Sequence, residues 1–132
     1  MTPFGAKLRR LRAARNIQLK AMAGGLGVSA AYLSALEHGH RGRPSSGLVQ
    51  QISAYFNLAW DDVDELKRLA ELSHPRVVVD TAGLTPEQTA LANRMAQMIP
   101  RLPPETVASL HAVLDATATQ TKPRLRRVAG RK

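Results

Sequence analysis

The chain has 132 residues and no cysteine, which allows one compact domain or a small domain with an appendage and excludes disulfides and thiolate metal sites. No apolar run approaches the roughly 18 residues of a membrane-spanning helix, and the amino terminus lacks the apolar core of a secretory signal. The net charge of +9 favours a polyanionic partner.

Three helices are predicted near the amino terminus. Apolar residues at helical spacing predict the first over Phe4–Arg15 and a short second over Leu19–Leu26. Gly27 then supplies a turn, in which a positive φ costs glycine little. Ser29 is a suitable N-cap for a third helix that ends near His38.

Two further helices complete the predicted first domain. Ser45 or Ser46 caps a fourth helix that ends before Asn57, and a fifth follows over Trp60–Leu72. The fifth begins with acidic residues and has basic residues in its second half, an order that complements the helix dipole. We therefore predict an all-α fold with a five-helix domain over residues 1–73.

The pattern changes in residues 74–84. Val77–Val79 is β-branched and extended in character, and it lies between Pro75 and Gly83. The segment near residues 76–80 is either a short strand or an ordered linker, and the sequence pattern fits both.

A helical hairpin is predicted over residues 85–120. Thr85, Pro86 and Gln88 form a capping box with proline at the first helical position, and three prolines from Pro100 onward make the turn. Such a hairpin cannot bury both apolar faces alone, so it packs on the fifth helix, pairs with another chain, or holds an effector or partner protein. The apolar residues expected at a dimer contact are Leu91, Met95, Ile99, Val107, Leu110 and Leu114.

Positive charge lies at both ends of the chain. Residues 1–43 carry eight Lys/Arg and one acid, and residues 122–132 carry six Lys/Arg and no acid. Nucleic acid fits this better than a membrane, because neither end offers a strongly apolar amphipathic face. Residues 121–132 are predicted to be a flexible basic tail, either an arm that follows phosphates or an unbound terminus.

Three stretches carry a family resemblance: FGAKLRRLRAARNIQL, LGVSAAYLSALEHG and RGRPSSGLVQQISAYFNL. From Phe4 to Leu72 they resemble the Xre family of lambda-repressor-like helix-turn-helix regulators of bacteria. The resemblance implies a five-helix DNA-binding domain that works as a homodimer on a palindromic operator, with the third helix in the major groove. It also favours dimerisation as the role of the hairpin, since a two-fold operator calls for a two-fold protein.

The resemblance also assigns residues by position. Gln18 is expected to meet a phosphate, and Arg12 and Glu37 match an internal salt bridge. The residues expected to face DNA from the third helix are Ser29, Ala30, Ala31, Tyr32, Ser34 and Ala35. The other expected DNA contacts are Lys20 and, in the loop after the third helix, His38, His40, Arg41 and Arg43.

The sequence departs from this family pattern at two places. Leu19 stands where many relatives have glutamine, and Ala30 and Ala31 stand where polar base readers are common. Small side chains let a helix approach the groove closely and can contact thymine methyl groups. We therefore expect the polar contacts to come from Tyr32, Ser34 and the arginine loop, and DNA shape to supply further specificity.

No metal ion, cofactor or catalytic site is expected. The chain has four histidines without metal-site spacing: His38, His40, His74 and His111. Four acids lie at a helix amino terminus, where acids are common, without calcium-loop spacing: Asp61, Asp62, Asp64 and Glu65. No catalytic triad, phosphate loop or pair of catalytic carboxylates stands out, so we predict that the protein is not an enzyme.

The sequence predicts a DNA-binding transcriptional regulator in the cytoplasm, associated with the nucleoid. Repression by occluding polymerase is favoured over activation through a surface of the acidic middle of the chain. Two other interpretations stay open. An antitoxin would regulate its own gene and also bind a toxin protein. A non-specific architectural protein would need only the two basic ends.

Overall fold

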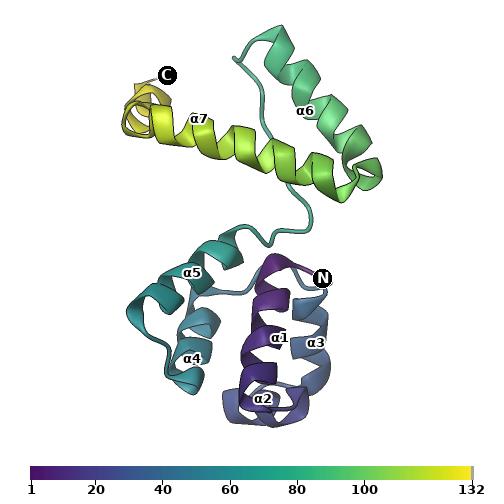
Figure 1. The fold of residues 1–132 in the computed structure, drawn as a ribbon, viewed down its shortest axis with the longest axis vertical. Coiled ribbons are helices and arrows are strands. Elements are labelled where there is room, and N and C mark those ends of the chain that lie inside the picture. Colours follow the sequence, from purple (N-terminus) through teal and green to yellow (C-terminus); the bar gives the residue numbers. More distant parts are fainter. Residues whose placement is uncertain (132) are drawn as a thin grey trace. The chain divides into compact units, whose positions relative to one another are not determined.

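The computed structural model describes the backbone of residues 1–131 and the side chains of residues 1–120. The chain divides into two compact units, unit 1 over Met1–Val78 and unit 2 over Val79–Lys132 (Figure 1). The backbone of residues 1–131 contains helices and no strand, which confirms the all-α fold class. The boundary between the units lies inside the segment predicted as linker or strand, residues 74–84.

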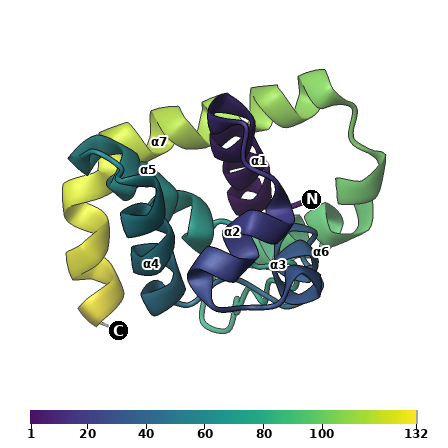
Figure 2. The ribbon, with the colours of Figure 1, turned by 90° about the horizontal axis from the view of Figure 1, so that it is seen from below.

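Unit 1 contains five helices: α1 (Pro3–Arg15), α2 (Leu19–Leu26), α3 (Ala30–Glu37), α4 (Ser46–Phe56) and α5 (Trp60–Glu71). Figure 1 shows α1 and α3 side by side with α2 at one end of both, and α4 and α5 on the other side of α1. Figure 2 shows the same unit from below, with α2 between α3 and α4.

Short polar side chains start three of these helices. Thr2, Ser29 and Ser45 each accept a hydrogen bond from the backbone N–H three residues on, at 3.0, 3.0 and 3.2 Å. Each cap satisfies a donor that the helix itself cannot pair. The caps at Ser29 and Ser45 confirm the predicted starts of α3 and α4, whereas the cap at Thr2 was not predicted.

Apolar side chains from all five helices meet in one core. The largest of them that are fully buried are Phe4, Leu8, Met22, Leu33, Leu36, Ile52 and Leu66. Each such burial contributes about 1.5–3 kcal/mol. Helices of 8 to 13 residues are marginal on their own, so this common core holds them in place.

Two glycines let elements of unit 1 approach closely. A Cβ at Gly5 would overlap the Glu37 carbonyl oxygen, and a Cβ at Gly25 would lie 2.5 Å from Cε1 of Tyr55. The Glu37 carbonyl, at the end of α3, also accepts the Thr2 backbone N–H at 3.0 Å. The start of α1 therefore holds the end of α3, and Gly25 stays in α2 despite its helix cost because α4 needs the space.

Unit 2 is a helical hairpin made of α6 (Pro86–Met98), the 3₁₀ turn η1 (Ile99–Arg101) and α7 (Pro104–Arg131). The predicted capping box is confirmed: Gln88 N–H donates to Thr85 Oγ1 at 3.1 Å, and Thr85 N–H donates to Gln88 Oε1 at 2.8 Å. The backbone of α7 includes residues 121–131, for which the sequence predicts a flexible tail. The side chains of residues 121–132, and with them the question of a DNA-binding arm, lie outside the described part.

The segment between the units is not a strand. Residues 77–81 show neither helix, turn nor bend, and Ala82 and Gly83 form a turn in which Gly83 has a φ of 84°. Of the two interpretations left open by the sequence, the described backbone has the linker.

Candidate nucleic-acid interface

Helices α2 and α3 form a bent pair at one end of unit 1. The bend between them is 108°, which lies within the roughly 90–120° of helix-turn-helix motifs. Gly27 ends α2 with φ 75° and ψ 27°, a left-handed conformation that glycine adopts at little cost. Because Leu33 and Leu36 of α3 are buried, the opposite side of α3 faces outward.

The outward side of α3 carries small side chains, of which only some are exposed to solvent. Ala31 is exposed, whereas Ser34 and Ala35 are half-buried. Ala30 is also half-buried and packs against the core, and the Ser29 hydroxyl accepts the Tyr32 N–H as the helix cap. Of the two alanines expected to meet bases, Ala31 is therefore the more accessible.

The basic loop after α3 returns to this helix through an aromatic contact. The guanidinium carbon of Arg41 lies 5.3 Å from the centroid of the Tyr32 ring, within the range of a cation–π interaction. Tyr32 is half-buried and packs against the core with part of its ring. The contact holds a positive charge beside α3, with the Tyr32 ring packed under the Arg41 guanidinium.

The two loop histidines stack on each other. The ring centroids of His38 and His40 are 6.4 Å apart with 24° between the planes, and both side chains are exposed. Nδ1 of His38 lies 2.9 Å from the Ser34 carbonyl oxygen. That bond fixes His38 at the end of α3 and leaves its other ring nitrogen open.

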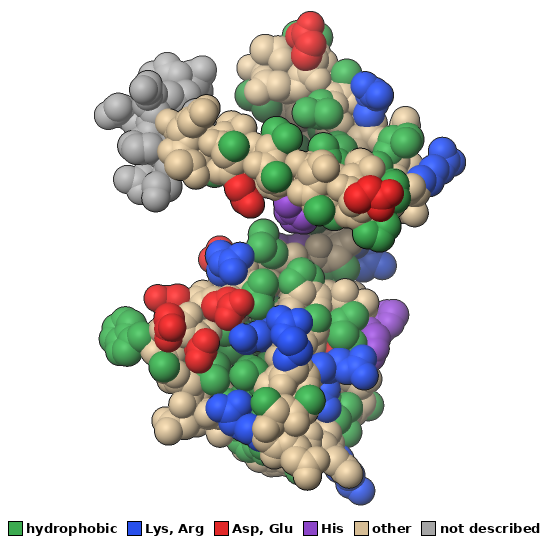
Figure 3. All heavy atoms as spheres, viewed as in Figure 1, with side chains coloured by type: hydrophobic (Ala, Val, Ile, Leu, Met, Phe, Trp, Pro, Cys, Tyr) green, Lys and Arg blue, Asp and Glu red, His purple; other side chains and the backbone are tan. Residues whose placement is uncertain are grey.

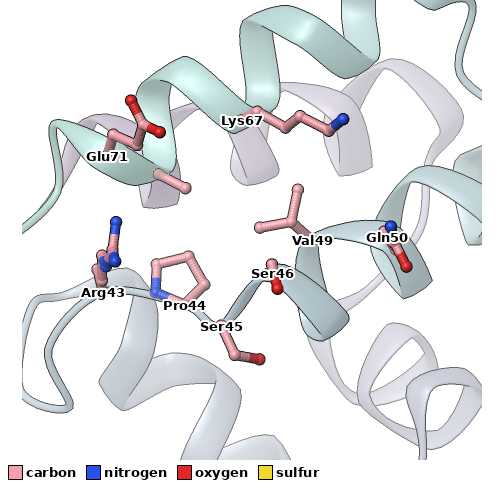
Figure 4. Close-up of a pocket in the computed structure, with 9 residues that line it drawn as sticks. Arg43, Pro44, Ser45, Ser46, Val49, Gln50, Lys67 and Glu71 are labelled. Carbon is pink, nitrogen blue, oxygen red and sulfur yellow. The ribbon is translucent and has the colours of Figure 1, made fainter.

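Arg43 lies on the α5 side of the loop. Together with Pro44, Ser46, Lys67 and Glu71 it lines a cavity of about 540 Å³ between the start of α4 and the second half of α5 (Figure 4). Figure 4 shows Arg43 extending toward α5, on the side of Glu71. Arg43 therefore needs a change of side-chain rotamer to lie beside Arg41 and α3.

The side chains of Gln18 and Lys20, at the start of α2, have no polar partner among the residues that the structure describes. Gln18 occupies the N-cap position but makes no capping hydrogen bond with its side chain, and Gln18 and Lys20 are both exposed. Free N–H groups and a nearby cation at a helix amino terminus suit a phosphate. These two residues lie at the beginning of the bent pair, which is where a phosphate contact is predicted for them.

A buried ion pair joins α1 to α3. Nη2 of Arg12 lies 3.0 and 2.9 Å from the two carboxylate oxygens of Glu37, whose side chain is 3% exposed. Burial raises the pKa of Glu37 above the ordinary value of 4.5, although Arg12 acts in the opposite direction. Nε of Arg12 is buried without a hydrogen-bond partner among the described residues. The pair is therefore internal to the fold and does not contribute to a DNA-facing surface.

Other basic residues of α1 also have structural partners, which charge counting did not reveal. Lys7 pairs with Glu65 at 3.1 Å. Arg15 donates to the Phe56 carbonyl at 3.2 Å and lies 5.0 Å above the Phe56 ring. Part of the positive charge of residues 1–43 thus has partners, at Lys7, Arg12 and Arg15. The other cations are exposed: Arg9 and Arg10 on α1, and Lys20, Arg41 and Arg43 beyond it.

Acidic side chains gather away from the bent helix pair. Figure 3 shows them at one edge of unit 1, with Lys and Arg scattered among apolar and other polar side chains on the rest of that face. They come from the first turns of α5, where Asp61 accepts the Asp62 N–H. Within the side chains described, no group of three or more His, Asp or Glu residues has the geometry of a metal site.

The expected dimer residues lie on unit 2 without being buried. Leu91, Ile99 and Leu114 are 60%, 57% and 64% exposed, and Met95, Val107 and Leu110 are half-buried. Across the side chains described for unit 2, none is buried. Both helices therefore keep apolar surface that their own unit does not cover.

Comparison with known proteins agrees with this geometry. Residues 3–66 match the sequence model of a family described as a helix-turn-helix domain. The matched residues make unit 1 similar to a helix-turn-helix domain. Over 63 residues the chain is 33% identical to a Bacillus subtilis (strain 168) protein described as the uncharacterized HTH-type transcriptional regulator RghRB. That match covers 48% of this chain and 45% of the relative, so the chain spans less than half the length of the relative it matches. No solved structure gave a significant match.

In the part of the chain that the structure describes, no single helix is long and apolar enough to cross a membrane. Taken together as one bent segment, α2 and α3 are long and apolar enough to meet this criterion, but this rests on length and composition only. Core helices can meet it too, and the buried side chains of this pair belong to the core of unit 1.

Proposed function

We propose that the protein is a sequence-specific DNA-binding transcriptional regulator of the Xre family, acting as a repressor on a palindromic operator. The helix-turn-helix domain supplies α3 for the major groove. The observation that carries the proposal is the contact of Arg41 with Tyr32, which holds a cation on the recognition helix itself.

In this proposal the exposed cations set the position of the protein on DNA. Lys20 at the start of α2 and Arg41 after α3 bind phosphates on either side of the groove that α3 enters, together with the loop histidines. Arg43 joins them by a rotamer change from the cavity beside α5. Ala31 reaches the groove floor closely, and Ser34 is the polar group best placed for a base edge.

Two copies of the chain bind the two half-sites through paired unit 2 hairpins. A unit of two helices without a buried side chain among those described lacks a core of its own, and domains of this size without one usually depend on oligomerisation. A second copy offers the same apolar residues on α6 and α7, so a two-fold contact is self-complementary. The recognition helices then meet successive major grooves about 34 Å apart.

The test is selection of bound fragments from genomic DNA with the full chain, followed by anisotropy titration at fixed salt. We expect one palindromic motif, bound at least about 1,000-fold more tightly than a shuffled duplex. Equal affinity for the two duplexes would refute sequence-specific regulation and support an architectural protein. A motif without internal two-fold symmetry would refute the paired half-sites.

A matched pair of variants locates the interface. Arg41→Ala with Arg43→Ala removes two charges from the proposed footprint, and Arg94→Ala with Arg101→Ala removes two exposed charges from unit 2. We expect the first variant to weaken all sites about tenfold or more and the second to change affinity much less. Similar losses in both variants would show that only net charge matters.

A further inference from the structure

No strand in the described part of the chain pairs with residues 76–80, whose sequence is Arg-Val-Val-Val-Asp. The side chains of Val77, Val78 and Val79 are 71%, 91% and 63% exposed. Among the described residues, the backbone N–H and carbonyl groups of residues 76–80 make no backbone hydrogen bond. Flexible linkers are usually polar and rich in glycine. This segment instead has three consecutive exposed valines, and its backbone groups are unpaired.

The segment has the properties of a strand with two free edges. β-Branched residues favour strands because they pack well on a pleated surface. A row of unpaired N–H and carbonyl groups is a template for pairing with another chain. Pro75 ends the segment on one side because proline lacks an N–H, and the turn at Ala82 and Gly83 ends it on the other.

The sequence of this segment is complementary to itself when it runs antiparallel. If two copies pair about a two-fold axis at Val78, Arg76 of each copy stands opposite Asp80 of the other, and Val78 stands opposite itself. Side chains alternate along a strand, so Arg76, Val78 and Asp80 share one face and Val77 and Val79 share the other. One face then carries two ion pairs around a valine pair, and the other carries four valines.

Other arrangements of the same segment lack this complementarity. A parallel in-register pair would set Arg76 against Arg76 and Asp80 against Asp80, and like charges directly opposite are destabilising. Arg76 makes no ion pair among the described residues. Asp80 accepts one hydrogen bond from the Ala82 N–H at 3.0 Å, and a carboxylate retains further acceptor positions for a guanidinium.

We propose that residues 76–80 of two copies form an antiparallel two-stranded ribbon across the two-fold axis of the dimer, with Arg76 of each copy paired to Asp80 of the other. The partner that pairs with this exposed segment is therefore the same segment of a second copy of the chain. The inference rests on the proposed homodimer, because a two-stranded ribbon alone is marginal in water and needs the adjacent hairpin contact. The ribbon would fix how the two copies are aligned along residues 76–80, because only one register pairs Arg76 with Asp80.

Cross-linking through a single cysteine tests the register. Opposed Cα atoms in an antiparallel pair lie about 4.5–5.5 Å apart, within the range of a disulfide. The chain has no cysteine, so Val78→Cys introduces only one thiol per copy. In the control His74→Cys, the two thiols lie four residues from the axis on opposite sides, about 26 Å apart at roughly 3.3 Å per residue.

Under a mild glutathione redox buffer we expect Val78→Cys to form a covalent dimer at least tenfold faster than His74→Cys. Equal rates for the two variants would overturn the ribbon. Sedimentation of both variants under reducing conditions shows whether the dimer is present. If it is present and binds its operator while the rates are equal, the ribbon is wrong and the proposed function stands.

Charge reversal tests the ion pairs separately. Arg76→Asp and Asp80→Arg each place like charges opposite in a homodimer and should weaken self-association about tenfold. Mixed in equal amounts, the two variants restore both pairs, so native mass spectrometry should show the heterodimer well above half of all dimers. The doubly reversed variant should regain the original affinity. A heterodimer share of only half, as random pairing gives, would overturn the ion pairs. If the unaltered chain itself neither dimerises nor binds an operator, the proposed function is wrong as well.

Discussion

The ion pair between Arg12 and Glu37 gives the sharpest test of how unit 1 is held together. Arg12→Met keeps most of the length of the side chain but removes its charge, which leaves the Glu37 carboxylate buried without a counterion. Breaking a buried pair from one side costs about 3–5 kcal/mol. In a domain of this size 1 kcal/mol lowers Tm by about 4–8 °C, so we expect a loss of about 12 °C or more at pH 7.

The pH dependence of this loss follows from the direction of the pKa shift. Burial raises the folded-state pKa of Glu37 above its unfolded value of 4.5. The stability contributed by its bound proton is therefore fully present below pH 4.5 and is lost as the pH rises through the folded-state pKa. Without Arg12 the pKa of Glu37 rises further, because the Arg12 guanidinium opposes the effect of burial more than Arg9 and His38 do. The variant should thus lose much less stability at pH 5 than at pH 7.

Urea and thermal denaturation, followed by circular dichroism at both pH values, measure the effect. The double variant Arg12→Met with Glu37→Gln removes both charges and should recover most of the loss at pH 7. Arg10→Met, an exposed position on the same helix, should change little. The reasoning is refuted if Arg12→Met loses the same free energy at pH 5 and pH 7, or if the double variant is as unstable as the single one.

Three other predictions concern packing and DNA contact. Gly5→Ala should destabilise unit 1 by about 1–3 kcal/mol or more in denaturation, since its Cβ would overlap the backbone of α3, whereas Gly47→Ala has open space and should be neutral or stabilising. Ala31→Gln should change the preferred bases in a binding selection, and an unchanged preference would show that α3 does not read bases there. If the dimer neutralises about eight phosphates, log K should fall against log salt with a slope of about −7, and a slope of about −2 would exclude the extended basic footprint.

Local patterns were enough to predict most of the fold. Ser29 and the Thr85–Gln88 capping box identify helix starts because a short polar side chain and its N–H partner lie within one turn. Apolar periodicity identifies the core faces of α1 to α5 for the same local reason. The end of α7 was harder to predict, because a basic sequence with few apolar residues is compatible with both a helix and a flexible tail.

The site depends on contacts that local patterns do not contain. The approach of Arg41 to Tyr32 requires the loop conformation between them, and the position of Arg43 beside α5 requires the packing of α4 on α5. Charge counting also treats every cation alike. It could not separate Lys7 and Arg15, which have partners inside unit 1, from Lys20, which has none there.

The outward-facing side chains of α3 are small, so in the proposed complex other parts of the protein must help to select the DNA sequence. With Ala30 against the core and Ala31 too small for a hydrogen bond, one recognition helix offers few polar groups to base edges. Phosphate contacts give affinity but carry no sequence information directly. In the proposed dimer, discrimination then comes from DNA shape and from the spacing between the two half-sites. That spacing is only as well defined as the proposed contact between the two copies. A dimer joined by exposed hairpins alone could slide by a helical turn, whereas a ribbon with two ion pairs has one favoured register. The charged ends of residues 76–80 would thus contribute to operator choice without touching DNA.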